Sequence, residues 1–370
     1  MKIIFALNHP AQYHLLKNPY KALREKGHEI IFVIKDKDIL EKLMISEGAK
    51  YELVTKKRVG RGKFSILAKG LVDLVIQDIN LYRITKKFAP DLMVGTDYCI
   101  THVGKLLRIP SIVLNEDDFE INKFFCRLAY PFCSSIISPT VCNVGRYQEK
   151  KINYDGYQKL AYLHPDVFTP DLRIVSKYTT PGEKYFLIRL VSFSAGHDIE
   201  MNHGGLQKLY IKKLIDVLLP YGKVYITSES EIPSDLEQYK LKIDFKDIHH
   251  LLAYASLFIA DSQSMIVESA MLGTPNIRFN SFVGKISVLE ELENKYGLTI
   301  GINNGNPEKL ITKVSEMLQT ENLKHSFIQK RDRMLKEKIN VNSFLIWFID
   351  TYPASKEIIR KDPEYQLNYR

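Results

Sequence analysis

Short apolar runs alternate with longer amphipathic stretches along most of the chain. The pattern is clearest at the start, where an apolar run at 2–7, an amphipathic stretch that ends near Gly27 and a second apolar run at 28–35 follow one another. A strand that is buried on both faces reads as a continuous apolar run, and a helix between two strands joins them in parallel. The sequence therefore predicts a β-α-β unit and a parallel sheet.

The alternation fills two halves of the chain and is interrupted between them. Residues 153–171 are rich in Tyr, Pro and Asp and show no regular period, which is typical of a linker. A chain of 370 residues is long enough for two domains. We therefore predict an α/β protein with two doubly wound Rossmann-like domains that face a central cleft. We place the N-terminal domain at 1–165 and the C-terminal domain at 166–340, with a final helix at 341–370 that packs back on the first domain.

Composition restricts the partners more than the fold. A formal net charge of +9 suits an anionic partner, such as a phosphorylated substrate, a nucleic acid or an anionic membrane. The basic residues are spread through predicted helices without a recognised binding motif, so we do not expect nucleic acid. The chain shows neither a secretory signal pattern nor an apolar run of spanning length, so we expect a cytoplasmic protein, with peripheral contact at the inner face of a membrane as a further option.

The four cysteines do not indicate a metal or redox site. None of them shows the C-x-x-C spacing of zinc or redox motifs. We expect ordinary buried thiols and no metal site. The residues are Cys99, Cys126, Cys133 and Cys142.

One stretch of the second half carries polar residues where a strand gives way to a helix. Asp261, Ser262, Gln263 and Ser264 follow an apolar run and precede an amphipathic one. A helix N-terminus at the carboxyl end of a strand offers free backbone N–H groups and the positive dipole end to an anion. Glu268 lies one turn further on the same helix side, from which a carboxylate can accept hydrogen bonds from a ribose diol. The alternative is an ordinary helix cap followed by a solvated Glu268.

This stretch resembles the donor-binding segment of GT-B-fold enzymes, most closely the UDP-N-acetylglucosamine 2-epimerases. Their pattern is Asp-Ser-Gly-Gly-x-Gln-Glu-Glu-Ala, then Gly-x-Pro. The matching positions are Asp261, Ser262, Glu268, Gly273 and Pro275. Gln263 and Ser264 replace the two glycines. The resemblance implies a GT-B fold in which Ser262, Gln263 and Ser264 contact a nucleotide diphosphate and Glu268 binds the ribose.

The resemblance continues in both halves of the chain. Asp97 and Glu116 match two acids of the epimerase pattern, and His9 stands where the family has an arginine before proline. His197 matches the histidine of a Thr-x-His-Arg-Arg-Glu-Asn motif whose arginines and glutamate are absent here. The overall likeness is greatest to the uncharacterised GT-B-like family DUF354, which implies a fold but no reaction.

Several side chains are candidates for the chemistry. His9, Asp97, Glu116 and Asp117 follow predicted strands of the first half, where a base or an acceptor-binding group belongs. The alternatives are a capping or packed histidine and a solvated acidic loop. Arg189, on the first predicted strand of the second half, would be a buried charge unless it reached the cleft and paired with an anion.

We therefore expect a GT-B glycosyltransferase. It would move a sugar from a nucleotide-diphosphate donor, with a UDP-sugar favoured, to a glycan or lipid-linked acceptor in surface polysaccharide synthesis. No cofactor and no obligatory metal are expected. Two alternatives stay open: a nucleotide-sugar epimerase, favoured by the retained acids, and a nucleotide-sugar-binding protein without catalysis.

A basic segment in the first half bears on the acceptor. Residues 56–64 carry several lysines and arginines and lead into a predicted helix whose apolar positions extend to Val75. Such a combination can rest on an anionic bilayer, where a lipid-linked acceptor would lie. We favour the alternative, in which the apolar stripe packs on the sheet and the charges are solvated.

Overall fold

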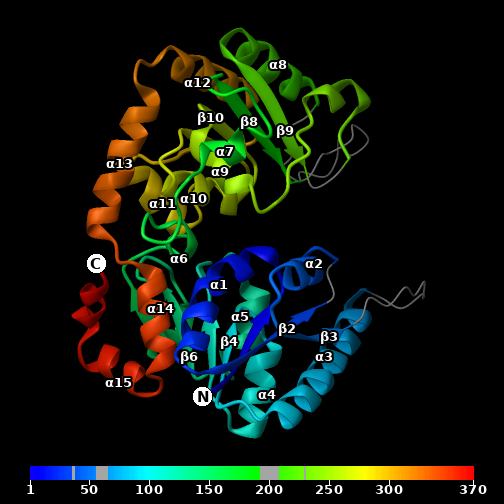
Figure 1. Ribbon diagram of the computed structural model, residues 1–370, viewed down its shortest axis with the longest axis vertical. Coiled ribbons are helices and arrows are strands. Elements are labelled where there is room, and N and C mark those ends of the chain that lie inside the picture. Colours follow the sequence, from blue (N-terminus) through cyan, green and yellow to red (C-terminus); the bar gives the residue numbers. More distant parts are fainter. Residues whose placement is uncertain (36–37, 56–65, 192–207, 229–230) are drawn as a thin grey trace. The chain divides into compact units, whose positions relative to one another are not determined.

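The structure is a computed structural model that describes residues 1–35, 38–55, 66–191, 208–228 and 231–370 (Figure 1). His197 and the basic segment 56–64 lie outside the described residues. The chain forms two compact units: Met1–Tyr162 with Ile339–Arg370, and Leu163–Lys338. These units divide the chain after residues 162 and 338, where the sequence led us to expect 165 and 340.

The first unit is built on a seven-stranded parallel sheet with the strand order β3-β2-β1-β4-β5-β6-β7. Its strands are β1 (Lys2–Leu7), β2 (Glu29–Lys35), β3 (Tyr51–Thr55), β4 (Leu92–Gly95), β5 (Ser111–Leu114), β6 (Ser135–Pro139) and β7 (Lys151–Tyr154). Its helices are α1 (Pro10–Glu25), α2 (Asp38–Ser46), α3 (Ile66–Phe88), α4 (Cys99–Leu107), α5 (Lys123–Ala129), η1 (Gly145–Lys150), α6 (Leu160–Leu163), α14 (Val341–Asp350), α15 (Ala354–Lys361) and η4 (Pro363–Tyr369). The four cysteines are free and buried, as expected.

Two local features of this unit differ from the sequence prediction. Helix α1 begins at Pro10, inside the predicted turn, because His9 and Gln12 form a capping box and proline fits the first helical turn. Strand β7 takes in Asn153 and Tyr154, which we had placed in the linker, and it pairs with β6. A four-residue strand at a sheet edge is too short to show a clear period.

The C-terminal segment belongs to the first unit, in which α14 packs against α1. Asp350, at the end of α14, forms an ion pair with Lys26 at 2.5 Å, and its Oδ1 lies 2.8 Å from His28 Nε2. Trp347 stacks on Tyr365 with ring centroids 4.9 Å apart. The only tryptophan of the chain therefore reports on the folding of this unit.

Helix α3 exposes an apolar stripe. Val72, Val75 and Ile79 are 55%, 48% and 46% exposed, whereas Leu81 is buried against the sheet. The expectation that Val75 packs on the sheet is therefore wrong, because Val75 lies on the same exposed side of the helix as Val72 and Ile79. Within the described part of the chain, no helix combines the length and the apolar character needed to cross a membrane.

His102 links three helices of the first unit. Its Nδ1 lies 2.9 Å from Asp78 Oδ2 on α3, and its Nε2 lies 3.0 Å from the Leu128 carbonyl oxygen on α5. Both neighbours accept hydrogen bonds only, so the geometry favours the doubly protonated ring. Burial lowers the pKa of His102, but the hydrogen bond and charge of Asp78 raise it above its usual value.

The first unit is expected to lose stability as the pH rises through the folded pKa of His102. A raised pKa means that the charged ring stabilises the fold fully below its unfolded pKa of about 6.5 and that this contribution disappears at higher pH. Urea unfolding followed by Trp347 fluorescence at about pH 6 and pH 8 measures the effect. His102→Gln should remove most of the difference, and an equal difference in this variant would contradict the assignment.

The second unit is built on a five-stranded parallel sheet with the strand order β12-β11-β10-β8-β9. Its strands are β8 (Tyr185–Leu190), β9 (Lys223–Ser228), β10 (Leu257–Ala260), β11 (Asn276–Phe279) and β12 (Ile300–Ile302). Its helices are α7 (Leu172–Val175), α8 (Lys208–Leu218), η2 (Leu219–Tyr221), η3 (Ser234–Tyr239), α9 (Ile248–Tyr254), α10 (Gln263–Met271), α11 (Ser287–Asn294), α12 (Pro307–Gln319) and α13 (Leu323–Glu337).

Candidate functional site

Each sheet has one point at which the order of its strands reverses. In the first unit this switch point lies between β1 and β4, and in the second it lies between β8 and β10. Ligands of open parallel sheets bind beyond the carboxyl ends of the strands at such a point. The residues that follow β1, β4, β8 and β10 therefore form the candidate sites of the two units.

In the second unit, the predicted diphosphate turn occupies the switch point. Ser262 caps α10, and its hydroxyl accepts a hydrogen bond from the Met265 N–H at 3.4 Å. Asp261 Oδ1 accepts a hydrogen bond from the Val191 N–H at 2.8 Å, which ties the end of β10 to the end of β8. The first turn of α10 contains Gln263 and Ser264, whose backbone N–H groups have no acceptor within the helix. This turn is a helix cap whose first N–H groups stay available, and binding of an anion there stays a prediction.

Glu268 lies in the second turn of α10 and is buried, with an exposed fraction of 5%. Its Oε1 is 3.3 Å from Nε2 of His249, which is also buried, on α9. The alternative of a solvated Glu268 is therefore wrong. His249 was missed by the sequence analysis, and its only signal was the pair of adjacent histidines that precedes an apolar run.

Arg189 lies near the carboxyl end of β8 and is half-buried. Its backbone is in register with Ala260 of β10, directly before Asp261. The structure thus brings Arg189 to the same strand ends as Asp261 and Ser262. Gln263 and Ser264 follow on α10, while His197 cannot be placed because it lies outside the described residues.

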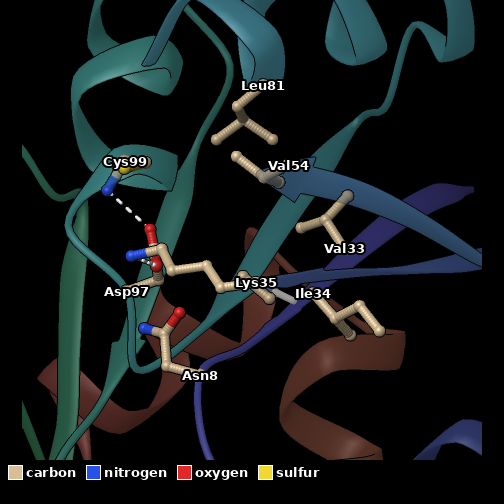
Figure 2. Close-up of a pocket in the computed structure, with 9 residues that line it drawn as sticks. Asn8, Val33, Ile34, Lys35, Val54, Leu81, Asp97 and Cys99 are labelled. Carbon is tan, nitrogen blue, oxygen red and sulfur yellow. Dashed lines mark hydrogen bonds and ion pairs between the residues drawn. The ribbon is translucent and has the colours of Figure 1, made fainter. Parts of the chain in front are cut away.

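In the first unit, a small cavity lies at the switch point and is lined by Asn8, Lys35, Asp97 and Cys99 (Figure 2). Lys35 Nζ is 2.8 Å from Asp97 Oδ2, and the N–H of Cys99 donates to Asp97 Oδ1 at 2.6 Å. Burial would raise the pKa of Asp97, but the Lys35 ammonium, together with hydrogen bonds from Asn8 and the Cys99 N–H, holds this pKa below its usual range. The Asp97 carboxylate therefore stays charged and paired, which makes it a weak base.

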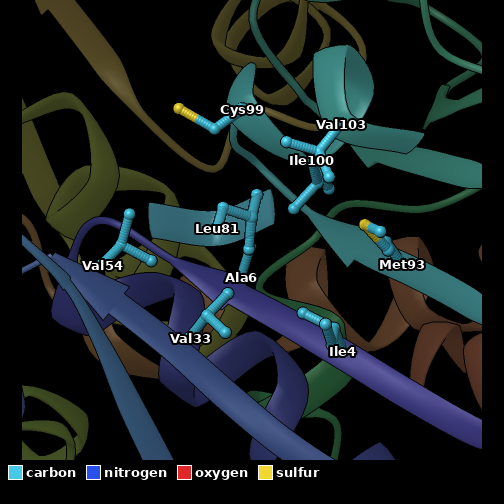
Figure 3. Close-up of a cluster of buried hydrophobic side chains, with 9 residues drawn as sticks. All are labelled: Ile4, Ala6, Val33, Val54, Leu81, Met93, Cys99, Ile100 and Val103. Atoms are coloured by element: carbon cyan, nitrogen blue, oxygen red, sulfur yellow. The ribbon is translucent and has the colours of Figure 1, made fainter. Parts of the chain in front are cut away.

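The apolar side of this cavity continues into the core between the sheet and the helices α3 and α4 (Figure 3). Val33, Val54 and Leu81 belong to both the cavity wall and the core cluster. Close-packed cores of this kind deform little, so the core restricts the movement of Lys35 and Asp97 beside it. Lys35 is a second residue that the sequence analysis missed, since a lysine at the end of an apolar run is an ordinary feature.

Glu116 and Asp117 follow β5 and lie in different environments. Glu116 forms an ion pair with the buried Lys159 and accepts a hydrogen bond from the Gln158 N–H at 3.2 Å. For Asp117, burial raises the pKa above its usual value, against a smaller opposing effect of a hydrogen bond from Asn122. Burial therefore makes the Asp117 carboxylate a stronger base than an exposed aspartate, whereas Glu116 is held in an ion pair.

His9 caps α1 from an exposed position after β1. Its Nδ1 accepts a hydrogen bond from the Ala11 N–H at 3.2 Å, so the neutral ring carries its proton on Nε2. In this tautomer Nε2 is a hydrogen-bond donor and not a base. The structure therefore brings His9, Asp97, Glu116 and Asp117 to the carboxyl edge of three neighbouring strands, but it places them in different environments.

The described residues contain no group of three or more His, Cys, Asp or Glu side chains that could hold a metal ion.

Known proteins match this chain in fold. No family model matches it, and no curated protein matches it in sequence. The UDP-GlcNAc 2-epimerase of Methanocaldococcus jannaschii matches with a TM-score of 0.62 at 14% identity, over 87% of this chain and 94% of that one. The enzyme of the same name from Neisseria meningitidis, bound to UDP-GlcNAc, matches with a TM-score of 0.60 at 12% identity, over 90% and 100% of the two chains. The glycosyltransferase SsfS6 of Streptomyces sp. SF2575 matches with a TM-score of 0.58 at 12% identity, over 95% and 100%.

The two parallel sheets and these likenesses confirm the predicted fold class. The chain is an α/β protein with two Rossmann-like domains and the GT-B fold. Its membership of the family DUF354 stays a prediction.

Proposed function

We propose that the protein is a GT-B glycosyltransferase that moves a sugar from a nucleotide-diphosphate donor, a UDP-sugar, to a glycan or lipid-linked acceptor in surface polysaccharide synthesis. The observation that carries this proposal is the position of Asp261, Ser262 and the α10 N-terminus at the switch point of the second sheet. A helix end suited to an anion, followed one turn later by a carboxylate, matches the diphosphate and the ribose hydroxyls of a nucleoside diphosphate.

The second unit would hold the donor. The N–H groups of Gln263 and Ser264 and the dipole of α10 would bind the diphosphate, and Glu268 would accept hydrogen bonds from the ribose hydroxyls. Arg189 at the end of β8 would supply positive charge to the phosphates. His197, which the sequence predicts to bind the nucleotide-sugar donor, stays part of this proposal.

The first unit would bind the acceptor and supply the base. Asp117 would take the proton of the acceptor hydroxyl while the oxygen of that hydroxyl forms a bond to the anomeric carbon of the sugar. The bond between that carbon and the diphosphate oxygen breaks, and the leaving diphosphate keeps the electron pair at the helix N-terminus. His9 would orient the acceptor through its Nε2–H, and Asp97 and Glu116 would shape the site as ion pairs with Lys35 and Lys159.

A lipid-linked acceptor fits the exposed stripe of α3. Val72, Val75 and Ile79 face outward, and the segment that precedes the helix is basic. Apolar side chains beside lysines and arginines match an anionic bilayer surface. We therefore include peripheral membrane contact in the proposal.

An epimerase is the second candidate, since the fold also matches epimerases. Epimerisation needs a group that removes a proton from the sugar and a group that returns one. Asp97 and Glu116, the two acids that favoured this reaction, are each paired with a lysine. These pairs favour transfer.

Incubation with UDP-N-acetylglucosamine separates the candidates. Without an acceptor, NMR should show an unchanged donor, and turnover should begin when a membrane extract containing acceptors is added. A new epimer or free sugar formed at an enzymatic rate without acceptor would contradict transfer. Binding without turnover under every condition would support the binding protein without catalysis.

A further inference from the structure

Glu268 is a carboxylate that the fold has taken out of water. A buried carboxylate costs several kcal/mol unless a partner satisfies it. His249 is such a partner, with its Nε2 3.3 Å from Glu268 Oε1, and both side chains are more than nine-tenths buried. The two residues come from different helices, α9 and α10, so this contact fixes the carboxylate relative to a second element.

His249 is itself held in place by aromatic packing. The ring of Phe168 meets it edge-on, with centroids 6.1 Å apart and an interplanar angle of 79°. The Phe168 ring also lies 4.8 Å from that of His250, whose Nδ1 accepts a hydrogen bond from the Asp171 N–H at 3.0 Å. The segment that carries Phe168 and Asp171 is thereby attached to α9, and the His249 ring packs against Phe168 with its Nε2 toward Glu268.

We infer that His249 is a positioning residue that aims the Glu268 carboxylate at the ribose of the nucleotide and so selects ribonucleotides over 2′-deoxyribonucleotides. This inference rests on the proposed nucleotide site. A ribose presents two adjacent hydroxyls, and each can donate to one oxygen of a carboxylate whose plane is fixed. A 2′-deoxyribose has lost one of these donors. A carboxylate that rotates freely discriminates less, because it adapts to the remaining hydroxyl.

The test is the ratio of the dissociation constants for 2′-deoxy-UDP and UDP, measured by calorimetry on the full chain. One hydrogen bond to a charged group corresponds to a ratio of about tenfold or more in the parent protein. Glu268→Gln should reduce the ratio. His249→Leu, which keeps volume and removes the polar contact with Glu268, should reduce it to a similar value. His249→Gln, whose amide nitrogen can replace Nε2, should retain most of it.

The variants also separate positioning from a purely structural role. If His249 only stabilised the fold, its loss would lower the melting temperature or weaken both nucleotides equally, and the ratio would stay at the parent value. A parent-like ratio in His249→Leu, or equal ratios in His249→Leu and His249→Gln, would overturn the inference while leaving the nucleotide site intact. A parent protein that binds neither nucleotide would overturn the nucleotide site and this inference with it.

Discussion

Replacement of Asp117 with asparagine is expected to lower sugar transfer by about a thousandfold, which is within the usual contribution of a general base. Burial raises the pKa of Asp117, with a further contribution from the charge of Asp118, so this carboxylate is a stronger base than an exposed aspartate. Asparagine keeps the shape and cannot take the proton. Initial rates with a UDP-sugar and the acceptor extract measure the loss.

The same residue predicts a pH dependence. The base must be deprotonated to work, so transfer should fall as the pH drops through the pKa of Asp117, which lies above the usual aspartate value of about 3.9. Glu120→Gln, a change at an exposed carboxylate of the same segment, is the control and should leave the rate unchanged. Full activity in Asp117→Asn, or an equal loss of UDP binding and of turnover, would contradict the role of base.

Replacement of Lys35 with methionine is expected to reduce the free energy of unfolding of the first unit by about 4 kcal/mol, because removal of one partner leaves a buried charge uncompensated. Asp97 is buried, and against this burial the charge and hydrogen bond of the Lys35 ammonium are the largest effects that lower its pKa, with smaller contributions from Asn8 and the Cys99 N–H. Without Lys35, burial should dominate and the pKa of Asp97 should rise. Urea unfolding followed by Trp347 fluorescence measures the loss.

A second substitution tests the explanation. Adding Asp97→Asn to Lys35→Met removes the unpaired charge and should recover a large part of the lost stability. If the double variant were as unstable as the sum of the two single variants, Lys35 and Asp97 would not act as a pair. Such additivity would contradict the electrostatic description of the cavity.

The fold could be predicted from the sequence because its helices and strands show strongly periodic patterns of apolar residues. Buried parallel strands such as β1 and β10 are continuous apolar runs, and the helices between them leave little choice of topology. Strand β7 was missed because it is short and lies within a segment rich in turn residues. The outward face of α3 was missed because an apolar stripe at helical spacing does not reveal which side of the helix the sheet covers.

The site could be predicted only in part from the sequence, since the side chains that pair with the predicted acids come from distant segments. The sequence pointed to Asp97, Glu116 and Glu268 but not to Lys35, Lys159 and His249, with which they pair. These pairs follow from the strand order and from helix packing, which no local spacing reports. They decide the chemistry, because a paired acid and an unpaired acid of the same type differ in pKa.

The most direct test of the central claim is hydrogen–deuterium exchange of the full chain with and without UDP. The account predicts slower exchange at 261–268, where backbone N–H groups of α10 would bind the diphosphate. The peptides that contain β1 and β4 should exchange at the same rate in both samples. Unchanged exchange at 261–268, with protection confined to the ends of β1 and β4, would contradict the placement of the nucleotide on the second unit.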